Sequence, residues 1–367
     1  MIDRLENFDS DELAKYVNPP KIKIFGVGGA GNNIMERLYI GNITGVETIA
    51  LDTDATKLNS IKASKRIVLG AETCKGRGAG GDPHIGRRSV KEAETALKEC
   101  IKDSDMVYII AGMGGGTGTG AAPAIAKMAT DMDTELVIGI SILPFEVEGK
   151  VKRKISNEGI EEFRRNCTTI IQLDNETLNE YEECKSYGME RMFGVMSDFI
   201  TNIVKEKVEI ITKVSTINVD YADIKKVLTM GGQAKIMYGH SNTSDPESVL
   251  NNLLGNPLIG SDYHGSKAIV IHIQAGKEFT LKSCEEIIGA LRVNLDEDVN
   301  MIWGYRTDPD MGNAVKVVMI ASAVPDDDDV VGSAFGDKSG PGPDNYGNKS
   351  GLGPDNYGNA LGIPMVN

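Results

Sequence analysis

Short apolar runs without polar alternation recur along the first half of the chain. They cover residues 21–25, 46–52, 66–70, 106–112 and 135–143, and stretches with helical spacing, such as 85–102, separate them. Strands that are apolar on both faces and alternate with helices are typical of a parallel sheet covered by helices on both sides. Ligands of such a sheet bind beyond the carboxyl ends of its strands.

The second half of the chain has a different pattern. A long helical stretch covers about 189–207, and apolar runs at 268–276, 299–305 and 315–324 follow it, with a helical segment at 281–293. This pattern predicts a smaller α+β domain after the long helix. A chain of 367 residues also has room for two domains, at roughly 150 residues each.

The two ends of the chain differ from the rest. Residues 1–20 predict a short N-terminal arm that ends at Pro19 and Pro20. After Val324 the sequence PDDDD is followed by a segment, 337–348, that 348–359 closely repeats. Because these repeats are rich in Gly, Pro and Asn, we expect a disordered linker over 325–359. The apolar last residues, 360–367, are either inert or a short docking peptide.

The charge of the chain excludes several classes of partner. Acidic residues outnumber basic ones by 53 to 39, for a net charge of −14. This balance argues against a general nucleic-acid binder and against direct contact with an anionic membrane. No apolar run approaches 18 residues and no signal peptide is recognisable, so we expect a cytoplasmic protein without membrane insertion. Five scattered cysteines without a CxxC pair indicate reduced thiols and no zinc site.

A glycine-rich turn follows the first apolar run. Gly26, Gly28 and Gly31 match the GxGxxG pattern between a strand and a helix, where backbone N–H groups can hold a phosphate. The pattern has three interpretations at this point: a tight structural turn, an NAD site with Asp52 on the ribose, or a site for another phosphate ligand.

A second turn, residues 112–120, favours the last interpretation. Six of its nine residues are glycine and two are threonine, so many backbone N–H groups and two hydroxyls can face an anion. Two converging turns suit a di- or triphosphate, and the absence of GxxxxGK[ST] excludes a standard P-loop. A third glycine cluster, 76–83, is either a flexible loop or a cover for the terminal phosphate.

The sequence GGGTGTG at 114–120 is the signature of the tubulin/FtsZ family, and the chain resembles FtsZ division GTPases from about residue 21 to 324. Further matches are GVGGAGNN (26–33), DTDA (52–55), GRGAGGDPHIGRR (76–88), PFEVEGKVKRK (144–154), NETL (175–178), NVDYAD (218–223), NPLI (256–259) and DPDM (308–311). The resemblance implies an α/β, tubulin/FtsZ-like fold. Its parts are a parallel-sheet GTP-binding domain at 21–188, a long central helix at 189–207 and a smaller α+β activation domain at 208–324.

The family also implies roles for residues that have plainer interpretations. From the residues alone, Glu148 and Arg153 form a surface ion pair, Phe193 is a core residue and Asp198 lies on a helix surface. The resemblance implies instead that Glu148 and Arg153 contact the ribose and that Phe193 stacks on the purine. It implies that the Asp198 carboxylate accepts hydrogen bonds from guanine N1–H and N2–H₂, and that Asn33 also contacts the base.

We therefore expect a site for GTP or GDP, accompanied by Mg²⁺. The residues expected to bind the nucleotide are Gly28, Gly29, Ala30, Gly31, Asn33, Asp52, Ala79, Gly80, Gly114, Gly115, Gly116, Thr117, Gly118, Thr119, Gly120, Glu148, Arg153, Asn175, Phe193 and Asp198. Asp52 departs from the family, which usually has Asn there, and the extra carboxylate either binds Mg²⁺ or repels phosphate.

The resemblance places the catalytic residues far along the chain, at Asn218, Asp220 and Asp223. In the family this loop reaches the nucleotide of the next subunit and positions a water against its γ-phosphate. The plainer interpretation is that Asp220 caps a helix and Asp223 is a favourable acid in its first turn.

The resemblance implies a GTP-dependent protein of the cell-division ring that polymerises head to tail, with GTP hydrolysed between subunits. The alternatives are a related filament with weak GTPase activity that acts as a scaffold, and an NAD-dependent oxidoreductase. Residues 360–367 would bind a membrane-anchoring adaptor and keep the polymer at mid-cell. The GIP sequence near the C-terminus, WGY at 303–305 and GGDP at 80–83 are similar to archaeal members.

Overall fold

Strands and helices alternate through the first half of the computed structural model, which describes residues 19–43, 45–180, 184–212, 216–217, 219–230, 233–255, 263–293, 295–296 and 298–324. The strands are β1 (Ile22–Val27), β2 (Val46–Asp52), β3 (Lys65–Val68), β4 (Met106–Gly112), β5 (Leu136–Leu143), β6 (Thr169–Asp174), β7 (Gln233–Ser241), β8 (Ala268–Ala275), β9 (Asn300–Thr307) and β10 (Val315–Val324). The α-helices are α2 (Gly28–Ile40), α3 (Ala55–Ser60), α4 (Pro83–Glu92), α5 (Glu94–Ile101), α6 (Gly116–Asp131), α7 (Lys150–Asn166), α8 (Met189–Thr212), α9 (Tyr221–Leu228), α10 (Pro246–Leu254) and α11 (Leu281–Arg292). Short 3-10 turns are η1 (Glu146–Glu148), η2 (Asn175–Glu180), η3 (Cys184–Ser186) and η5 (Pro309–Met311).

All these strands belong to one sheet, in the order β3-β2-β1-β4-β5-β6-β7-β10-β8-β9. Neighbouring strands from β3 to β7 are parallel. Strand β10 is antiparallel to both β7 and β8, and β9 is parallel to β8. The predicted fold class, a parallel-sheet domain, a long helix and a smaller α+β domain, is confirmed. The halves are nevertheless joined edge to edge, because β6 and β7 pair at Ile170 and Gln233.

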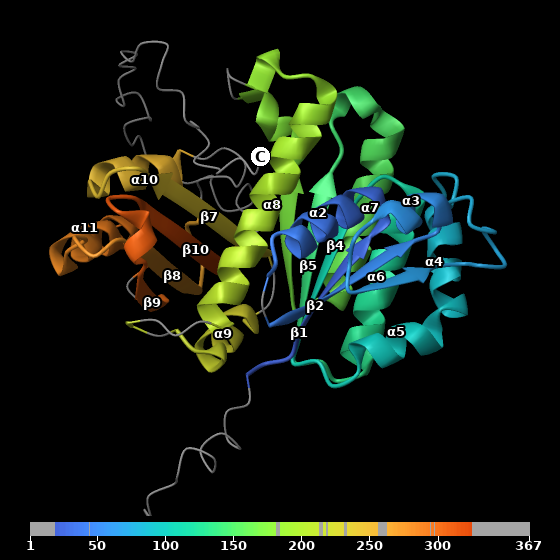
Figure 1. The fold of residues 1–367 in the computed structure, drawn as a ribbon, viewed down its shortest axis with the longest axis horizontal. Coiled ribbons are helices and arrows are strands. Elements are labelled where there is room, and N and C mark those ends of the chain that lie inside the picture. Colours follow the sequence, from blue (N-terminus) through green and yellow to red (C-terminus); the bar gives the residue numbers. More distant parts are fainter. Residues whose placement is uncertain are drawn as a thin grey trace, which may run out of the picture.

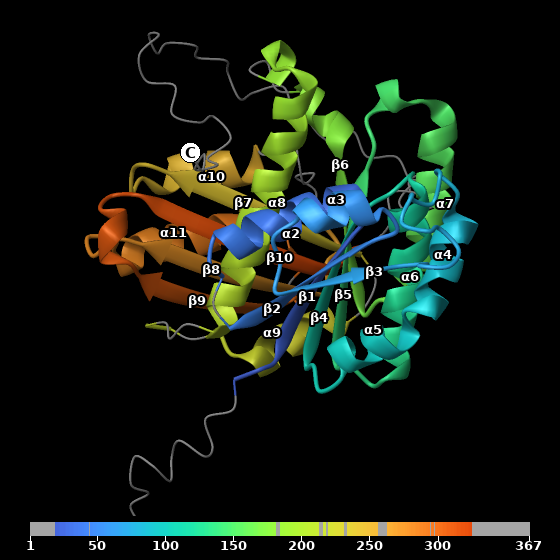
Figure 2. The ribbon, with the colours of Figure 1, turned by 45° about the vertical axis from the view of Figure 1, so that its right-hand side comes forward.

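Helices cover both faces of the parallel strands (Figures 1 and 2). Successive side chains of a strand point to opposite faces, and Ile24 and Phe25 of β1 accordingly lie in two different cores. The core around Ile24 includes apolar residues of α2 and α8, and the core around Phe25 includes those of α6. Helix α8 runs between the parallel strands and the C-terminal strands (Figure 1), so it contributes to the packing of both halves.

Several elements have the bounds that the apolar pattern predicts, namely the strands at 46–52, 106–112 and 315–324. The helical stretch at 85–102 is two helices that meet at Ala93, and the long helix extends to Thr212. The arm before residue 19 and the segments 325–359 and 360–367 lie outside the described residues. No helix in the described ranges is both long and apolar enough to cross a bilayer.

Candidate functional site

The β1–α2 turn and the β4–α6 turn lie against each other at the carboxyl ends of adjacent strands. A Cβ atom on Gly28, whose φ is +72°, would lie 3.2 Å from the backbone nitrogen of Gly118. A Cβ atom on Gly31 would lie 2.2 Å from the carbonyl oxygen of Ile110. Neither α2 nor α6 has a side-chain N-cap. The first N–H groups of both helices can therefore bind an anion.

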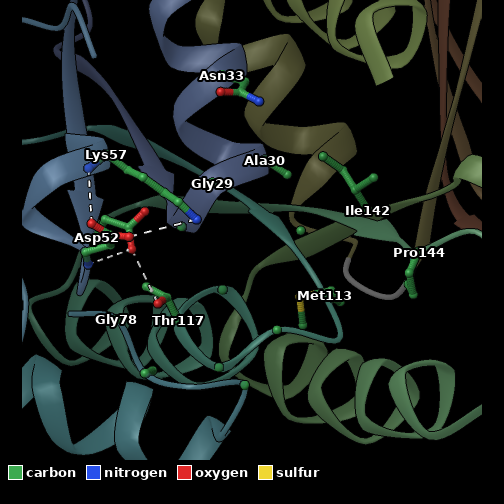
Figure 3. A pocket seen from close by; sticks show the side chains of 18 of the residues that line it. Gly29, Ala30, Asn33, Asp52, Lys57, Gly78, Met113, Thr117, Ile142 and Pro144 are labelled. Carbon is green, nitrogen blue, oxygen red and sulfur yellow. Dashed lines mark hydrogen bonds and ion pairs between the residues drawn. The ribbon is translucent and has the colours of Figure 1, made fainter. Parts of the chain in front are cut away.

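A cavity of about 600 Å³ lies where these turns meet. Figure 3 shows that Asp52, Gly78 and Thr117 lie at one end of it, whereas Asn33, Ile142 and Pro144 lie at the other. The predicted nucleotide-binding residues that line it are Gly28, Gly29, Ala30, Asn33, Asp52, Ala79, Gly80, Gly115, Gly116, Thr117, Gly118, Glu148, Asn175 and Phe193.

Four further predicted residues lie outside the lining because they serve the packing of the turns. Gly31 contacts the backbone of β4, and the hydroxyl of Thr119 accepts a hydrogen bond of 2.8 Å from the N–H of Gly114. A Cβ atom on Gly120 would lie 1.9 Å from the carbonyl oxygen of Pro83. These residues therefore shape the turns and the contact between α4 and α6 in this structure.

Arg153 also lies outside the lining, where the sequence predicts a ribose contact. Its guanidinium donates two hydrogen bonds of 2.8 Å to the carboxylate of Asp174 and one of 2.9 Å to the carbonyl oxygen of Pro144. This arrangement fixes the ends of β5 and β6 beside the cavity. Lys152, one residue earlier, lines the cavity instead and forms an ion pair with Glu148.

The end of the cavity formed by η1 and α8 carries the groups suited to a base. Phe193 is 39% exposed, and Phe145 packs against it edge to face with ring centroids 5.3 Å apart. Asn175 is buried, and its side-chain oxygen has no hydrogen-bond partner among the residues that the structure describes. This end therefore offers an aromatic face and an open acceptor.

Asp198 lies just behind this end and outside the lining. Its carboxylate forms an ion pair with Arg37 of α2, whereas the neighbouring residue Ser197 lines the cavity. Burial raises the pKa of the Asp198 carboxyl, and Arg37 opposes that shift. The Asp198 carboxylate is therefore directed toward Arg37 through Oδ1 in this structure.

Asp52 stands at the opposite end with its carboxylate buried. The backbone N–H of Asp54 donates to it at 3.1 Å, and the hydroxyl of Thr117 and the side-chain amide of Asn32 each donate at 3.4 Å. Burial is the main reason that the pKa of the Asp52 carboxyl is raised. The departure from Asn noted in the sequence thus places a carboxylate inside the cavity.

Sequence analysis missed three cations of the lining, Lys57, Arg77 and Lys152. Arg77 lies within the third glycine cluster and Lys152 within the match at 144–154, so both stand in segments that the sequence singles out, whereas Lys57 follows the match at 52–55 by two residues. For Arg77 and Lys152 the signal was a basic residue inside a matched motif. The strands and turns could be predicted from the local sequence, whereas the positions of these three side chains depend on how the loops pack against one another.

The predicted catalytic carboxylates lie at the start of α9. Asp220 accepts a hydrogen bond of 2.9 Å from the N–H of Asp223, and the carboxylate of Asp223 accepts one of 3.3 Å from the N–H of Asp220. The two residues therefore form a helix cap, as the plainer interpretation predicts, and this cap uses one oxygen of each carboxylate. Asn218 lies outside the described residues.

The loop before α9 is attached to both halves of the molecule. Ile217 and Tyr305 of β9 exchange two backbone hydrogen bonds of 3.0 Å. On the other side, the Tyr221 hydroxyl lies 3.0 Å from both the carbonyl oxygen of Asp105 and the carboxylate of Glu135. Asp220 is therefore held beside the N-terminal ends of β4 and β5.

Two family models match the chain: the GTPase domain of the Tubulin/FtsZ family over residues 21–183 and the C-terminal domain of the FtsZ family over residues 232–325. The chain is 37% identical to Cell division protein FtsZ 1 of Methanocaldococcus jannaschii, over 86% of this chain and 87% of that protein. It is 38% identical to Cell division protein FtsZ 2 of Haloferax volcanii, over 86% of this chain and 78% of that protein. Its structure is similar to that of an empty FtsZ dimer from M. jannaschii, with a TM-score of 0.78, 37% identity and coverage of 85% of this chain and 91% of that chain.

Proposed function

The chain belongs to the FtsZ family of tubulin-like GTPases, and from its geometry we propose that it hydrolyses GTP between two copies stacked head to tail. It is a polymerising cell-division GTPase that binds GTP and GDP. In the proposed mechanism, the nucleotide lies in the cavity of one copy and the Asp220 loop of the next copy completes the site.

The observation that carries this proposal is the separation of the two parts within one copy. Glu135 contacts the helix that begins at Tyr221, whereas Pro144 lines the cavity. The eight residues of β5 lie between them, and an extended strand of that length spans about 25 Å. The loop therefore cannot reach the nucleotide of its own chain, but it can reach the cavity of a copy stacked along the strand direction.

We propose that the guanine lies at the end with Phe193. A purine can stack on the exposed face of that ring, and Asn33 and the open oxygen of Asn175 are available as polar contacts. Asp198 would turn from Arg37 to the guanine edge, where a carboxylate accepts from two adjacent donors that adenine lacks. An analogue without those donors leaves buried polar groups unpaired, which is costly.

The phosphates would then lie along the glycine turns, with Mg²⁺ beside them. The carboxylate of Asp52 and the hydroxyl of Thr117 are 3.4 Å apart, and hard oxygen donors of this kind fit Mg²⁺. When bound, Mg²⁺ neutralises charge that develops on the phosphate oxygens. The Thr117 hydroxyl and the N–H groups at the start of α6 orient the chain of phosphates.

In the proposed reaction, a water of the seam attacks the γ-phosphorus in line with the bond to the β-phosphate oxygen. That bond breaks, and GDP and inorganic phosphate result. Asp220 and Asp223 of the adjacent copy orient the water and accept its proton, and the family resemblance adds Asn218 to this set. Because a second molecule places these carboxylates, hydrolysis depends on assembly.

The test is GTP hydrolysis per molecule as the protein concentration rises. We expect a threshold in the wild type and a rate at least about 100-fold lower in Asp220→Asn, with GTP binding retained. Asn keeps the helix cap, so loss of the carboxylate is isolated. Asp245→Asn is the matched control, because Asp245 caps α10 in the same way by accepting from the N–H of Ser248 at 3.0 Å. A rate per molecule that is independent of concentration would refute hydrolysis between copies.

We further propose that residues 360–367 bind a membrane-anchoring adaptor and that the linker 325–359 lets the polymer reach it at the mid-cell ring. The support is the apolar character of the last residues after a long polar segment. Removal of 360–367 should abolish attachment of polymers to adaptor-bearing vesicles and leave assembly unchanged. Undiminished attachment would show that the last residues are inert.

A further inference from the structure

The end of the cavity opposite Phe193 carries charge of both signs. Asp52, Asp54, Lys57 and Arg77 all line it. Figure 3 shows the Lys57 side chain extended across this end toward Gly29, at the start of α2. If the guanine lies beside Phe193, as proposed above, the terminal phosphate lies at this charged end.

Both cations are fixed to one wall of the cavity. Asp54 caps α3 by accepting from the N–H groups of Thr56 and Lys57, at 3.0 and 3.1 Å. The backbone of Arg77 pairs with that of Asp54 as an isolated antiparallel bridge. Lys57 and Arg77 are therefore both attached to the segment that also holds Asp52.

Glycines make this pairing possible. Gly76 and Gly78 flank Arg77 with φ values of +72° and +87°, a region that suits glycine. The carbonyl oxygen of Gly76 accepts from the N–H of Ala55 at 3.1 Å, and the N–H of Gly78 donates to the carbonyl oxygen of Thr53 at 3.0 Å. The loop is thus turned so that Arg77 stands at the cavity.

The two cations at this end differ in how they are paired. Lys57 forms an ion pair with Oδ2 of Asp54 at 3.9 Å, whereas the helix cap uses Oδ1 of that carboxylate. Arg77 has no ion pair within the part of the chain that the structure describes. The third lining cation, Lys152, is paired with Glu148. Arg77 is therefore available for an anion, and Lys57 is held only by a long contact with Asp54.

A terminal phosphate needs such cations here. The glycine turns offer only neutral N–H donors, and the carboxylate of Asp52 offsets part of the charge of the Mg²⁺ that it would hold, so a third phosphate needs further cations. The diphosphate part of the ligand can be held by the turns, whereas the third phosphate extends toward Lys57 and Arg77. Hydrogen bonds between charged groups are about twice as strong as neutral ones.

We infer that Lys57 and Arg77 bind the terminal phosphate of GTP and make the site prefer the triphosphate over the diphosphate. The inference rests on the proposed position of the nucleotide. Both cations belong to the same subunit that binds the nucleotide. They offset the charge of Asp52 and would lose their partner when the terminal phosphate leaves.

The test compares the affinities of the nucleotide-free, full-length protein for GDP and for a non-hydrolysable GTP analogue, at a concentration below assembly and with Mg²⁺ present. The variants are Lys57→Gln, Arg77→Gln, the double variant and Lys57→Arg. Lys62→Gln and Lys75→Gln are matched controls, because these lysines are exposed on the same segments and do not line the cavity.

We expect the double variant to bind the GTP analogue at least about tenfold more weakly, the loss typical of a hydrogen bond between charged groups. Its affinity for GDP should change less than about twofold, since the diphosphate contacts remain. Lys57→Arg should keep most of the wild-type preference, and both controls should keep all of it.

An unchanged ratio of the two affinities, whether from equal losses or from no loss, would overturn the inference. An unchanged ratio combined with impaired assembly would assign the two cations to contact with the next subunit instead. Both results leave the proposed function intact, because the variants still bind guanine nucleotide. A wild-type protein that binds neither nucleotide would instead refute the proposed function itself.

Discussion

Removal of the Tyr221 hydroxyl should slow hydrolysis without weakening nucleotide binding. Tyr221 is the first residue of α9 and follows Asp220 directly. Its hydroxyl lies 3.0 Å from the carbonyl oxygen of Asp105 and 3.0 Å from the carboxylate of Glu135. Lys225 binds the same carboxylate at 2.8 Å. Tyr221→Phe removes the hydroxyl and keeps the ring.

The size of the effect follows from the exposure of these groups. A hydrogen bond to a charged group contributes about 1.5–3 kcal/mol when shielded from water. The Glu135 side chain is 43% exposed, so about 1 kcal/mol is the appropriate value after allowance for solvent screening. If that interaction holds Asp220 in position, its loss should lower the rate of GTP hydrolysis in assembled polymer about fivefold.

The relevant protonation states are constant near neutral pH. Lys225 and then Tyr221 lower the pKa of the Glu135 carboxyl below its ordinary value of 4.5. Burial and the neighbouring Glu135 raise the pKa of the Tyr221 phenol, so it stays a donor. A carboxyl with a lowered pKa stabilises the fold above that ordinary value and loses its contribution as the pH falls through the folded pKa. The difference between wild type and variant should therefore be constant between about pH 6 and 8.

The assay is GTP hydrolysis at protein concentrations well above the assembly threshold, with GTP affinity of the dilute protein measured separately. Glu135→Gln and the double variant complete a cycle, and Tyr39→Phe, an exposed tyrosine on α2, is the control. If the hydroxyl acts through Glu135, the double variant should be no slower than the slower single variant. Equal losses of rate and GTP affinity, or additive losses in the double variant, would refute a positioning role.

Three further substitutions, the first with a matched control, give independent tests. Gly120→Ala should destabilise the GTP-binding half by about 2–3 kcal/mol in chemical denaturation, since its Cβ would meet backbone 1.9 Å away, whereas Gly115→Ala, with open space around it, should change stability by well under about 1 kcal/mol. Asp198→Asn should weaken GTP binding at least about tenfold and improve binding of xanthosine triphosphate, whose edge complements an amide; unchanged base preference would remove Asp198 from base recognition. Phe193→Ala should weaken GTP and GDP alike by about tenfold through loss of stacking, and a loss confined to one of the two nucleotides would contradict stacking.

The parallel strands could be predicted because they are buried on both faces. Strands β2 and β4 are uninterrupted apolar runs, and their bounds match the pattern. Strands β6 and β7 were not predicted, because polar residues such as Gln172 and Lys235 interrupt their apolar runs. Their pairing joins the two halves, and pairing between distant segments leaves no mark on local periodicity.

The same distinction separates the predicted from the unpredicted parts of the site. The glycine turns are local features, and both line the cavity. The ion pairs Arg37–Asp198 and Arg153–Asp174 join residues 161 and 21 positions apart. Whether a charged side chain faces a ligand or a partner depends on such contacts, so the sequence could name Asp198 and Arg153 as candidates without locating their side chains.

The carboxylates that line the cavity all have partners in this structure. Within the described residues, the lining carboxylates are Asp52, Asp54 and Glu148. Asp52 accepts hydrogen bonds from its own loop and from Thr117, Asp54 caps α3, and Glu148 binds Lys152 and the N–H of Phe145. The proposed acceptor for the proton of the attacking water comes from outside this lining. In the proposed mechanism a neighbouring copy supplies it at the start of α9, because strand β5 separates that loop from its own cavity.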